Sequence, residues 1–138
     1  MKKLMTLAIF FGFLIITAQE KKSGTIQLQI DNIENDKGQM LIGLYDSEDN
    51  WLSKIYVGKV AKITDGSAEI TFENVPLGVY AISVFHDEDN NGKLKTFLGI
   101  PAESTGSSNN APARFGPPKW EDAKFTLAEK TVHQKIAL

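Results

Sequence analysis

The stretch FENVPLGVYAISVFHD, residues 72–87, decides the fold class. It starts at the end of a segment, 68–73, in which apolar and polar residues alternate as in a strand with one buried face. The Pro-Leu-Gly at 76–78 predicts a turn. From 79 to 87 apolar residues then occupy both alternating positions, which is typical of a central strand covered on both sides. The stretch therefore predicts neighbouring strands of a sheet.

Similar patterns lie on either side of this stretch. Residues 24–31 and 39–46 read as strands, and 123–129 and 131–138 as two more. About seven strands with turns between them predict an all-β protein, an antiparallel β-sandwich of the transthyretin-like or immunoglobulin-like kind. One long irregular loop is expected within 87–120, because twelve of the twenty residues from Gly99 to Pro118 are Gly, Pro, Ser or Asn. We expect a single domain over residues 24–138.

The N-terminus has the composition of a secretory signal peptide. Lys2 and Lys3 precede an apolar run over 4–16, and Thr17-Ala18 offers a cleavage site. The run is shorter than the roughly 20 residues of a spanning helix. We therefore expect a signal peptide over 1–18, a short tail over 19–23, and a mature chain without a membrane span. No cysteine follows the run to carry a lipid, so a periplasmic or extracellular protein without a lipid anchor is expected.

Charge and cysteine content exclude several classes of function. Without Lys2 and Lys3, thirteen cationic residues face seventeen acidic ones, so the net charge of the mature chain is −4. This balance gives no overall attraction to nucleic acid or to anionic lipid. The chain has no cysteine, which excludes disulfides, thiol catalysis and cysteine-bound zinc.

A candidate metal loop follows the central strand. Asp87, Asp89 and Asn91 alternate before Gly92, as in the first half of an EF-hand calcium loop, and the Lys93 carbonyl occupies the next ligand position. The second half of the motif is missing. The twelfth position is Leu98 instead of a bidentate glutamate, and a strand instead of a helix precedes the loop.

Glu103, five residues beyond the normal closing position, is the first candidate to close such a half-loop. Glu88 and the amides of Asn109 and Asn110 are the alternatives, and the Lys95 charge would weaken binding. The expected ligand set is thus Asp87, Asp89, Asn91, Lys93 and Glu103. Calcium is the expected ion, bound with a dissociation constant on the order of 10⁻⁴–10⁻³ M, as in extracellular modules. The alternative is a solvated turn in which these side chains only bind their own backbone.

Two further functions are open. The same long loop offers a surface for an envelope polysaccharide or a partner protein, with the candidate residues His86, Asn109, Asn110, Arg114 and Trp120. Trp120 can instead pack the returning loop onto the body, and Phe97, Ile100 and Phe115 can pin the same loop there. The second alternative is a metal-dependent hydrolase built on His86, Asp87 and Glu103, although the spacing of a zinc hydrolase motif is missing. Ser104, Ser107 and Ser108 read as flexible, linker-like residues, and a non-enzymatic protein is expected.

The chain also resembles a known family. The segments LGVYAISVFHDEDNNGKL and GIPAESTGSSNNAPARFGPPKWEDAKF are similar to the secreted bacterial family named domain of unknown function 2141. The resemblance also covers KGQMLIGLYD and FENVPLGVYA, and so extends over nearly the whole mature chain. It implies a signal peptide and a sandwich similar to transthyretin-like and carboxypeptidase-regulatory-like modules, and it implies no activity. Lys95 departs from the acidic residue usual in the family.

Overall fold

The computed structural model describes residues 18–138, so 1–17 of the predicted signal peptide lie outside the described residues. Strands dominate the described chain, with one 3-10 helix and one short α-helix. Their bounds are β1 Ser23–Asp31, β2 Gln39–Tyr45, β3 Val57–Ala61, β4 Ala68–Pro76, β5 Gly78–Asp87, β6 Thr96–Phe97, β7 Ile100–Pro101, β8 Thr105–Ser107, η1 Ser108–Asn110, α1 Trp120–Ala123, β9 Phe125–Leu127 and β10 Thr131–Ala137. Neither of the helices in residues 18–138 has the length and hydropathy to cross a membrane.

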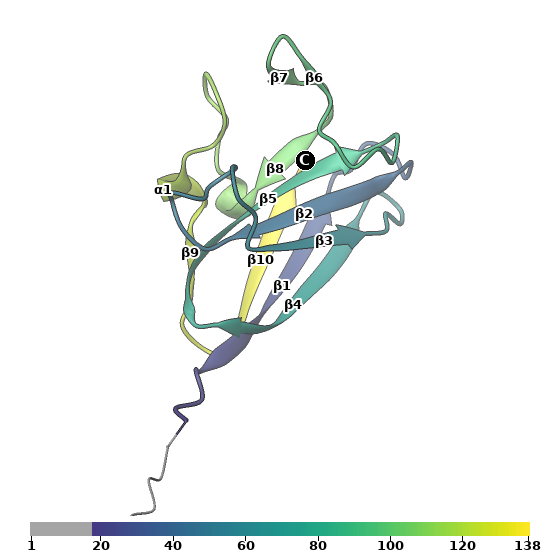
Figure 1. Cartoon of the computed structure of the whole chain (residues 1–138). Coiled ribbons are helices and arrows are strands. Elements are labelled where there is room, and N and C mark those ends of the chain that lie inside the picture. The colour runs from purple at the N-terminus through teal and green to yellow at the C-terminus, as the bar shows by residue number, and fades with distance from the viewer. Residues whose placement is uncertain (1–17) are drawn as a thin grey trace, which may run out of the picture.

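The strands form two sheets that face each other, which confirms the predicted all-β sandwich (Figure 1). One sheet has the order β10-β1-β4. The other has the order β3-β2-β5-β8, and β9 pairs with the first part of β5 beside it. Every described pairing is antiparallel except β1 with β10, which run parallel from Thr25 opposite Thr131 to Asp31 opposite Ala137. Side-chain alternation reports which face is buried and carries no information on strand direction, so the sequence could not indicate this pair.

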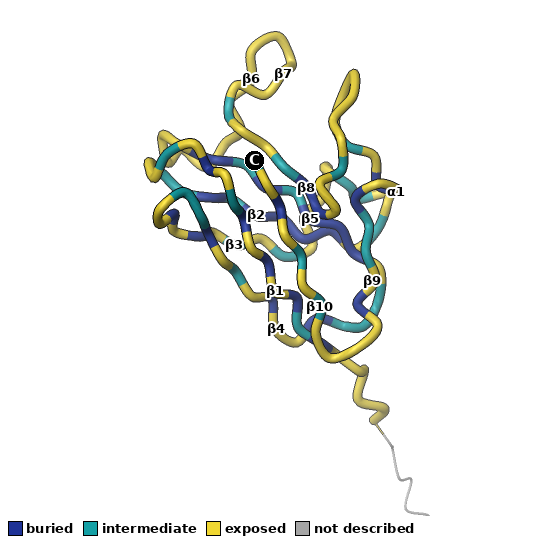
Figure 2. The backbone as a smooth tube through the Cα atoms, turned by 180° about the vertical axis from the view of Figure 1, so that it is seen from behind, coloured by how far each residue is buried: buried dark blue, intermediate teal, exposed yellow. Residues whose placement is uncertain are grey.

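The core lies between the two sheets and is built from the inward positions of each strand (Figure 2). Fully buried members include Ile26 and Ile30 of β1, Phe72 of β4, Met40 and Leu44 of β2, Ile82 and Val84 of β5, and Ile136 of β10. The outward residues of β1 and β10 are polar apart from Ala137, as the alternation predicts.

Strand β5 is covered on both faces, as its apolar pattern predicts. Its inward residues join the main core, while Ala81 on the opposite face belongs to a second cluster with Tyr45, Trp120 and Ala123. Trp51 packs edge-on against Tyr45 with ring centroids 5.0 Å apart, and against Trp120 at 6.0 Å. Its Nε1–H donates to the Pro118 carbonyl at 2.8 Å. This cluster holds the end of the long loop against the sheet.

The long loop is less irregular than its composition suggests. It contains the two-strand hairpin β6–β7, the strand β8 on the edge of the β5 sheet, and η1. Ser107 and Ser108 are 2% and 0% exposed, so their interpretation as flexible residues is wrong. The Ser108 hydroxyl accepts the Ile82 N–H at 2.8 Å and donates to the Ala123 carbonyl at 2.6 Å. It thereby fills the gap that β8 and β9 leave along β5.

Candidate metal centre at the end of strand β5

Asp87 is the last residue of β5, and its carboxylate is the centre of the turn that follows. The residue is 0% exposed. One oxygen accepts the Asn91 N–H at 3.2 Å, and the other accepts the Gly92 N–H at 3.0 Å and the Gln39 side-chain amide at 2.8 Å. Gly92 adopts a φ of +74°, which favours glycine and lets the chain bend around the carboxylate. The turn is therefore built around a buried negative charge.

The surroundings of Asp87 favour its ionised form. Burial by itself raises the pKa of the carboxyl group, because a charge loses its hydration there. The hydrogen bonds from Gln39, Gly92 and Asn91 and the interaction with Asp89 outweigh burial, and the pKa lies below its usual value. A carboxylate whose surroundings favour its ionised form is thus held at the base of the loop.

Asp89 and Glu103 lie beside this charge. One carboxylate oxygen from each of Asp87, Asp89 and Glu103 lies within 4.8 Å of the others. Glu103 comes from the chain that returns after the β6–β7 hairpin. Its two oxygens accept the Glu88 N–H at 3.3 Å and the Lys95 N–H at 2.9 Å. The three carboxylates that the sequence singled out are therefore brought together by the fold.

The remaining predicted ligands are differently placed. The Asn91 amide donates to Asp89 at 3.0 Å, and its oxygen accepts the Lys93 N–H at 2.8 Å, so it closes the turn. Lys93 is exposed. Lys95 lines, with Glu88, Asp89, Ala102 and Glu103, a hollow of about 310 Å³ at the carboxylates. A cationic side chain therefore borders the hollow in which an ion would lie.

His86 faces the interior, so the expectation that it contributes to a ligand surface is wrong. It is 0% exposed, on the same face of β5 as Ile82 and Val84. Its Nε2 bonds to the Lys37 carbonyl at 2.6 Å, and Nδ1 lies 3.9 Å from Glu88. Because a carbonyl only accepts, Nε2 carries the proton. The carboxylate group found among residues 18–138 does not include this histidine, so the geometry of the hydrolase alternative is not assembled.

The other predicted surface residues divide into two kinds. Trp120 is 8% exposed and packs in the second cluster, so it is not available to a ligand. Asn109 and Asn110 hold η1 against its neighbours: Asn109 donates to the Asp122 and Lys124 carbonyls, and Asn110 accepts the Ala137 N–H at 2.9 Å. Arg114 is exposed. Of this set, only Arg114 presents a free side chain to solvent.

Two residues of the site were not predicted from the sequence. Gln39 lies directly opposite Asp87 in the β2–β5 register and donates to it. Gly38, with a φ of +69°, packs against the backbone of Asp87 and Glu88. The sequence indicated a turn at this position, but only the pairing of strands 48 residues apart places it at the carboxylate.

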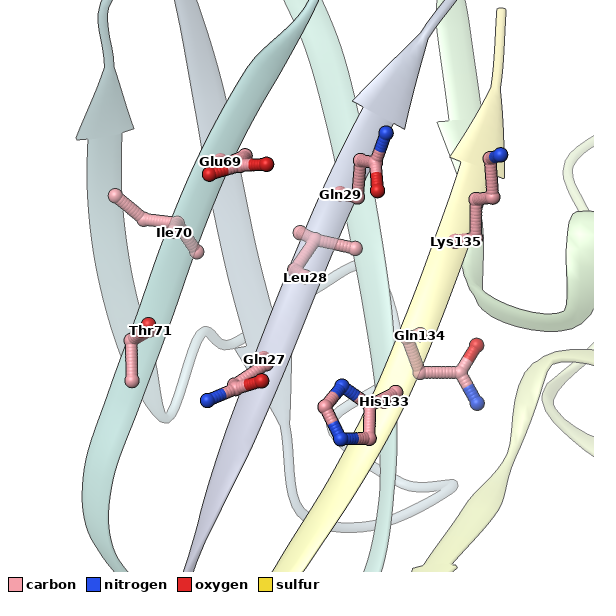
Figure 3. Close-up of a pocket in the computed structure, with 9 residues that line it drawn as sticks. All are labelled: Gln27, Leu28, Gln29, Glu69, Ile70, Thr71, His133, Gln134 and Lys135. Atoms are coloured by element: carbon pink, nitrogen blue, oxygen red, sulfur yellow. The ribbon is translucent and has the colours of Figure 1, made fainter.

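A second hollow lies elsewhere, on the outer face of the β10-β1-β4 sheet. This groove of about 440 Å³ is bordered by polar side chains from all three strands, among them Gln27, Gln29, Thr71, His133 and Lys135 (Figure 3). It is shallow, and its lining contains no Phe, Tyr or Trp, the rings on which a sugar most often stacks. Nothing in its arrangement favours the polysaccharide alternative.

The fold and this site define a class of protein: a β-sandwich module with a carboxylate cluster where a long loop leaves its central strand. The chain belongs to the family described as an uncharacterized protein conserved in bacteria (DUF2141), whose family model matches residues 28–135. This confirms the resemblance found in the sequence. Searches of curated proteins and of solved structures found no match to the chain.

Proposed function

We propose that the protein is an exported, non-enzymatic module that binds calcium weakly through Asp87, Asp89 and Glu103 and presents the segment 87–120 as its functional surface. The observation that carries the proposal is the approach of three carboxylate oxygens to within 4.8 Å. Calcium prefers carboxylate and carbonyl oxygens and tolerates irregular geometry. Water would complete its six to eight ligands.

The position of the cluster supports a role in ordering the loop. Asp87 belongs to the central strand, whereas Glu103 belongs to the returning end of the segment that carries β6 and β7. An ion shared by the two would tie the base of this segment to the sheet. Without an ion, three negative groups repel one another at the same place. The export part of the proposal rests on the leader-like composition of residues 1–18.

A thermal melt with calcium and with a chelator tests the proposal. With an ion at about ten times its dissociation constant, mass action adds about 1.4 kcal/mol, which raises the melting temperature by about 4–6 °C. Asp89→Asn and Glu103→Gln keep an oxygen in place for the loop and remove a charge. We expect each to lose most of the shift and to melt slightly higher than the wild type in chelator, because repulsion falls.

Asp49→Asn provides the matched control, because Asp49 is an exposed aspartate in another loop. It should keep the full calcium shift. If Asp89→Asn and Glu103→Gln also keep the full shift, the site is wrong. If both instead melt several degrees lower in chelator, the carboxylates serve the turn alone.

Lys95→Gln should strengthen calcium binding. Lys95 borders the hollow at the carboxylates. Removing a unit charge about 8 Å from a divalent ion changes the energy by about 1 kcal/mol in a water-like medium, or about fivefold in affinity. Isothermal titration at low ionic strength measures the change, and Lys62→Gln, at an exposed lysine in another loop, is the control. Unchanged affinity in Lys95→Gln would place the ion away from this hollow.

A further inference from the structure

Two loops project from the sandwich at one end, and each carries exposed apolar residues. One is the β6–β7 hairpin, and the other is the segment 112–119 before α1; both views show them rising from the same end of the molecule (Figures 1 and 2). Phe97, Leu98 and Ile100 of the hairpin are 73%, 86% and 68% exposed, and Phe115 is fully exposed. The prediction that Phe97, Ile100 and Phe115 pin the loop to the body is therefore wrong. Only Trp120 does so.

The apex of each loop has an apolar residue in the left-handed region of the backbone. Leu98 and Phe115 adopt positive φ values of 51° and 55°, and each is followed by a glycine, at 77° and 147°. Leu98 and Gly99 form the two-residue turn between β6 and β7, where Asn or Asp is preferred at the first position. Phe115 lies in an irregular bend, and a bulky side chain at positive φ is strained in both places. The backbone alone therefore does not account for leucine or phenylalanine at these positions. Strain of this kind persists at functional sites, and exposed apolar side chains mark a surface for a partner.

The two tip segments are cationic, although the protein as a whole is acidic. Residues 93–102 carry Lys93 and Lys95, residues 112–119 carry Arg114 and Lys119, and neither tip segment contains an acid. The base of the first loop carries four acids, Asp87, Glu88, Asp89 and Glu103. Outside the two tip segments, the mature chain has nine cationic and seventeen acidic residues. An anionic surface would attract the tips and repel the body, and so would orient the molecule.

We propose that these two apolar loop tips insert into the interface of an anionic phospholipid bilayer, with the surrounding lysines and arginine on the lipid headgroups. Both tips project from the surface, and a fluid lipid bilayer can close around projecting side chains. A protein partner would instead need two pockets that match the two tips. Apolar and aromatic side chains at the interface, flanked by cations, are the combination that binds peripheral proteins to membranes. The inference depends on the proposed role of 87–120 as a surface and does not depend on calcium.

The absence of cysteine from the chain allows a site-specific test. Leu98→Cys, Phe115→Cys and the control Lys130→Cys, an exposed site in the β9–β10 turn at the other end, each accept one environment-sensitive fluorophore. With phosphatidylglycerol-containing vesicles, we expect a blue shift and quenching by lipid-borne nitroxide at 98 and 115, and neither at 130. All variants are purified as the mature chain from residue 19, the form that the proposed export predicts, so that the apolar residues 4–16 do not contribute to binding.

Binding strength is measured separately by vesicle co-sedimentation. Replacing Leu98 or Phe115 with serine should weaken binding by on the order of tenfold each, because the apolar side chain no longer enters the interface. Arg114→Gln combined with Lys119→Gln should weaken it by about 25-fold, at about fivefold for each charge. Absence of any response at 98 and 115, an equal response with neutral vesicles, or a response to protein concentration alone, as expected for a second copy, would overturn the proposal.

The calcium proposal and the membrane proposal can be tested independently of each other. If the protein binds vesicles in chelator and calcium does not shift its melting temperature, the membrane proposal is supported and the calcium site is contradicted. If the calcium shift is lost in Asp89→Asn and the fluorophores at 98 and 115 do not respond to vesicles, the calcium site is supported and the membrane proposal is contradicted.

Discussion

Gly38→Ala is expected to lower the free energy of unfolding by about 3–4 kcal/mol, because it combines left-handed backbone strain with overpacking. Gly38 has a φ of +69°. A Cβ there would overlap the Asp87 carbonyl oxygen and come within 2.6 Å of the Glu88 Cα, both of which are backbone atoms that cannot rotate away. The melting temperature should fall by about 12–15 °C for a domain of this size.

Gly99→Ala separates the two causes. Gly99 has a φ of +77° and nothing within 4 Å of the added atom, so only the strain applies, and about 1 kcal/mol is expected. Gly38→Ala should also reduce the calcium shift, because the added atom displaces the backbone that carries the Asp87 carboxylate. Equal melting temperatures for the two variants would show that β2 and β5 do not approach at this point.

Ser108→Ala is the second large effect, expected at about 2–4 kcal/mol, since two buried backbone groups lose their partner. The Ile82 N–H and the Ala123 carbonyl both bond to this hydroxyl, which is fully buried. Alanine occupies nearly the same volume and makes neither bond, and water has no access to replace them. Chemical denaturation measures the loss, and hydrogen exchange at the Ile82 amide should become faster.

Ser107→Ala is the matched control. Ser107 is equally buried, but its hydroxyl donates a long bond of 3.4 Å to the Ala111 carbonyl. Its removal should cost less than about 1 kcal/mol. A comparable loss in both variants would mean that burial of the loop, and not the bridge through Ser108, determines the stability there.

The sequence predicted those structural features that depend on residues close together in the chain. The alternation in 68–73 and the two-faced pattern in 79–87 identified β4 and β5, and the spacing of Asp87 and Asp89 placed two carboxylates on one turn. Glu103 was predicted because it lies five residues beyond the position at which an EF-hand loop is normally closed. The structure brings these three together, and calcium binding stays a prediction.

The predictions that were wrong concern features that depend on contacts between distant segments of the chain. Ser107 and Ser108 have the composition of a linker, yet β8 pairs with β5 from Ser83 opposite Ser107 to Phe85 opposite Thr105. Composition reports what a segment prefers alone, and tertiary pairing overrides it. Similarly, Phe97 and Phe115 are apolar and were assigned to the body, because hydrophobicity alone does not distinguish a core residue from one at an exposed tip.

The parallel pairing of β1 with β10 has a consequence for the order of folding. The first long strand cannot complete its sheet until residues 131–137 have been made, because Thr25 pairs with Thr131. Contacts this distant in the chain slow folding, since the loop between them must close first. In a chain emerging from its N-terminus, this edge of β1 would therefore stay unpaired until residues 131–137 have emerged.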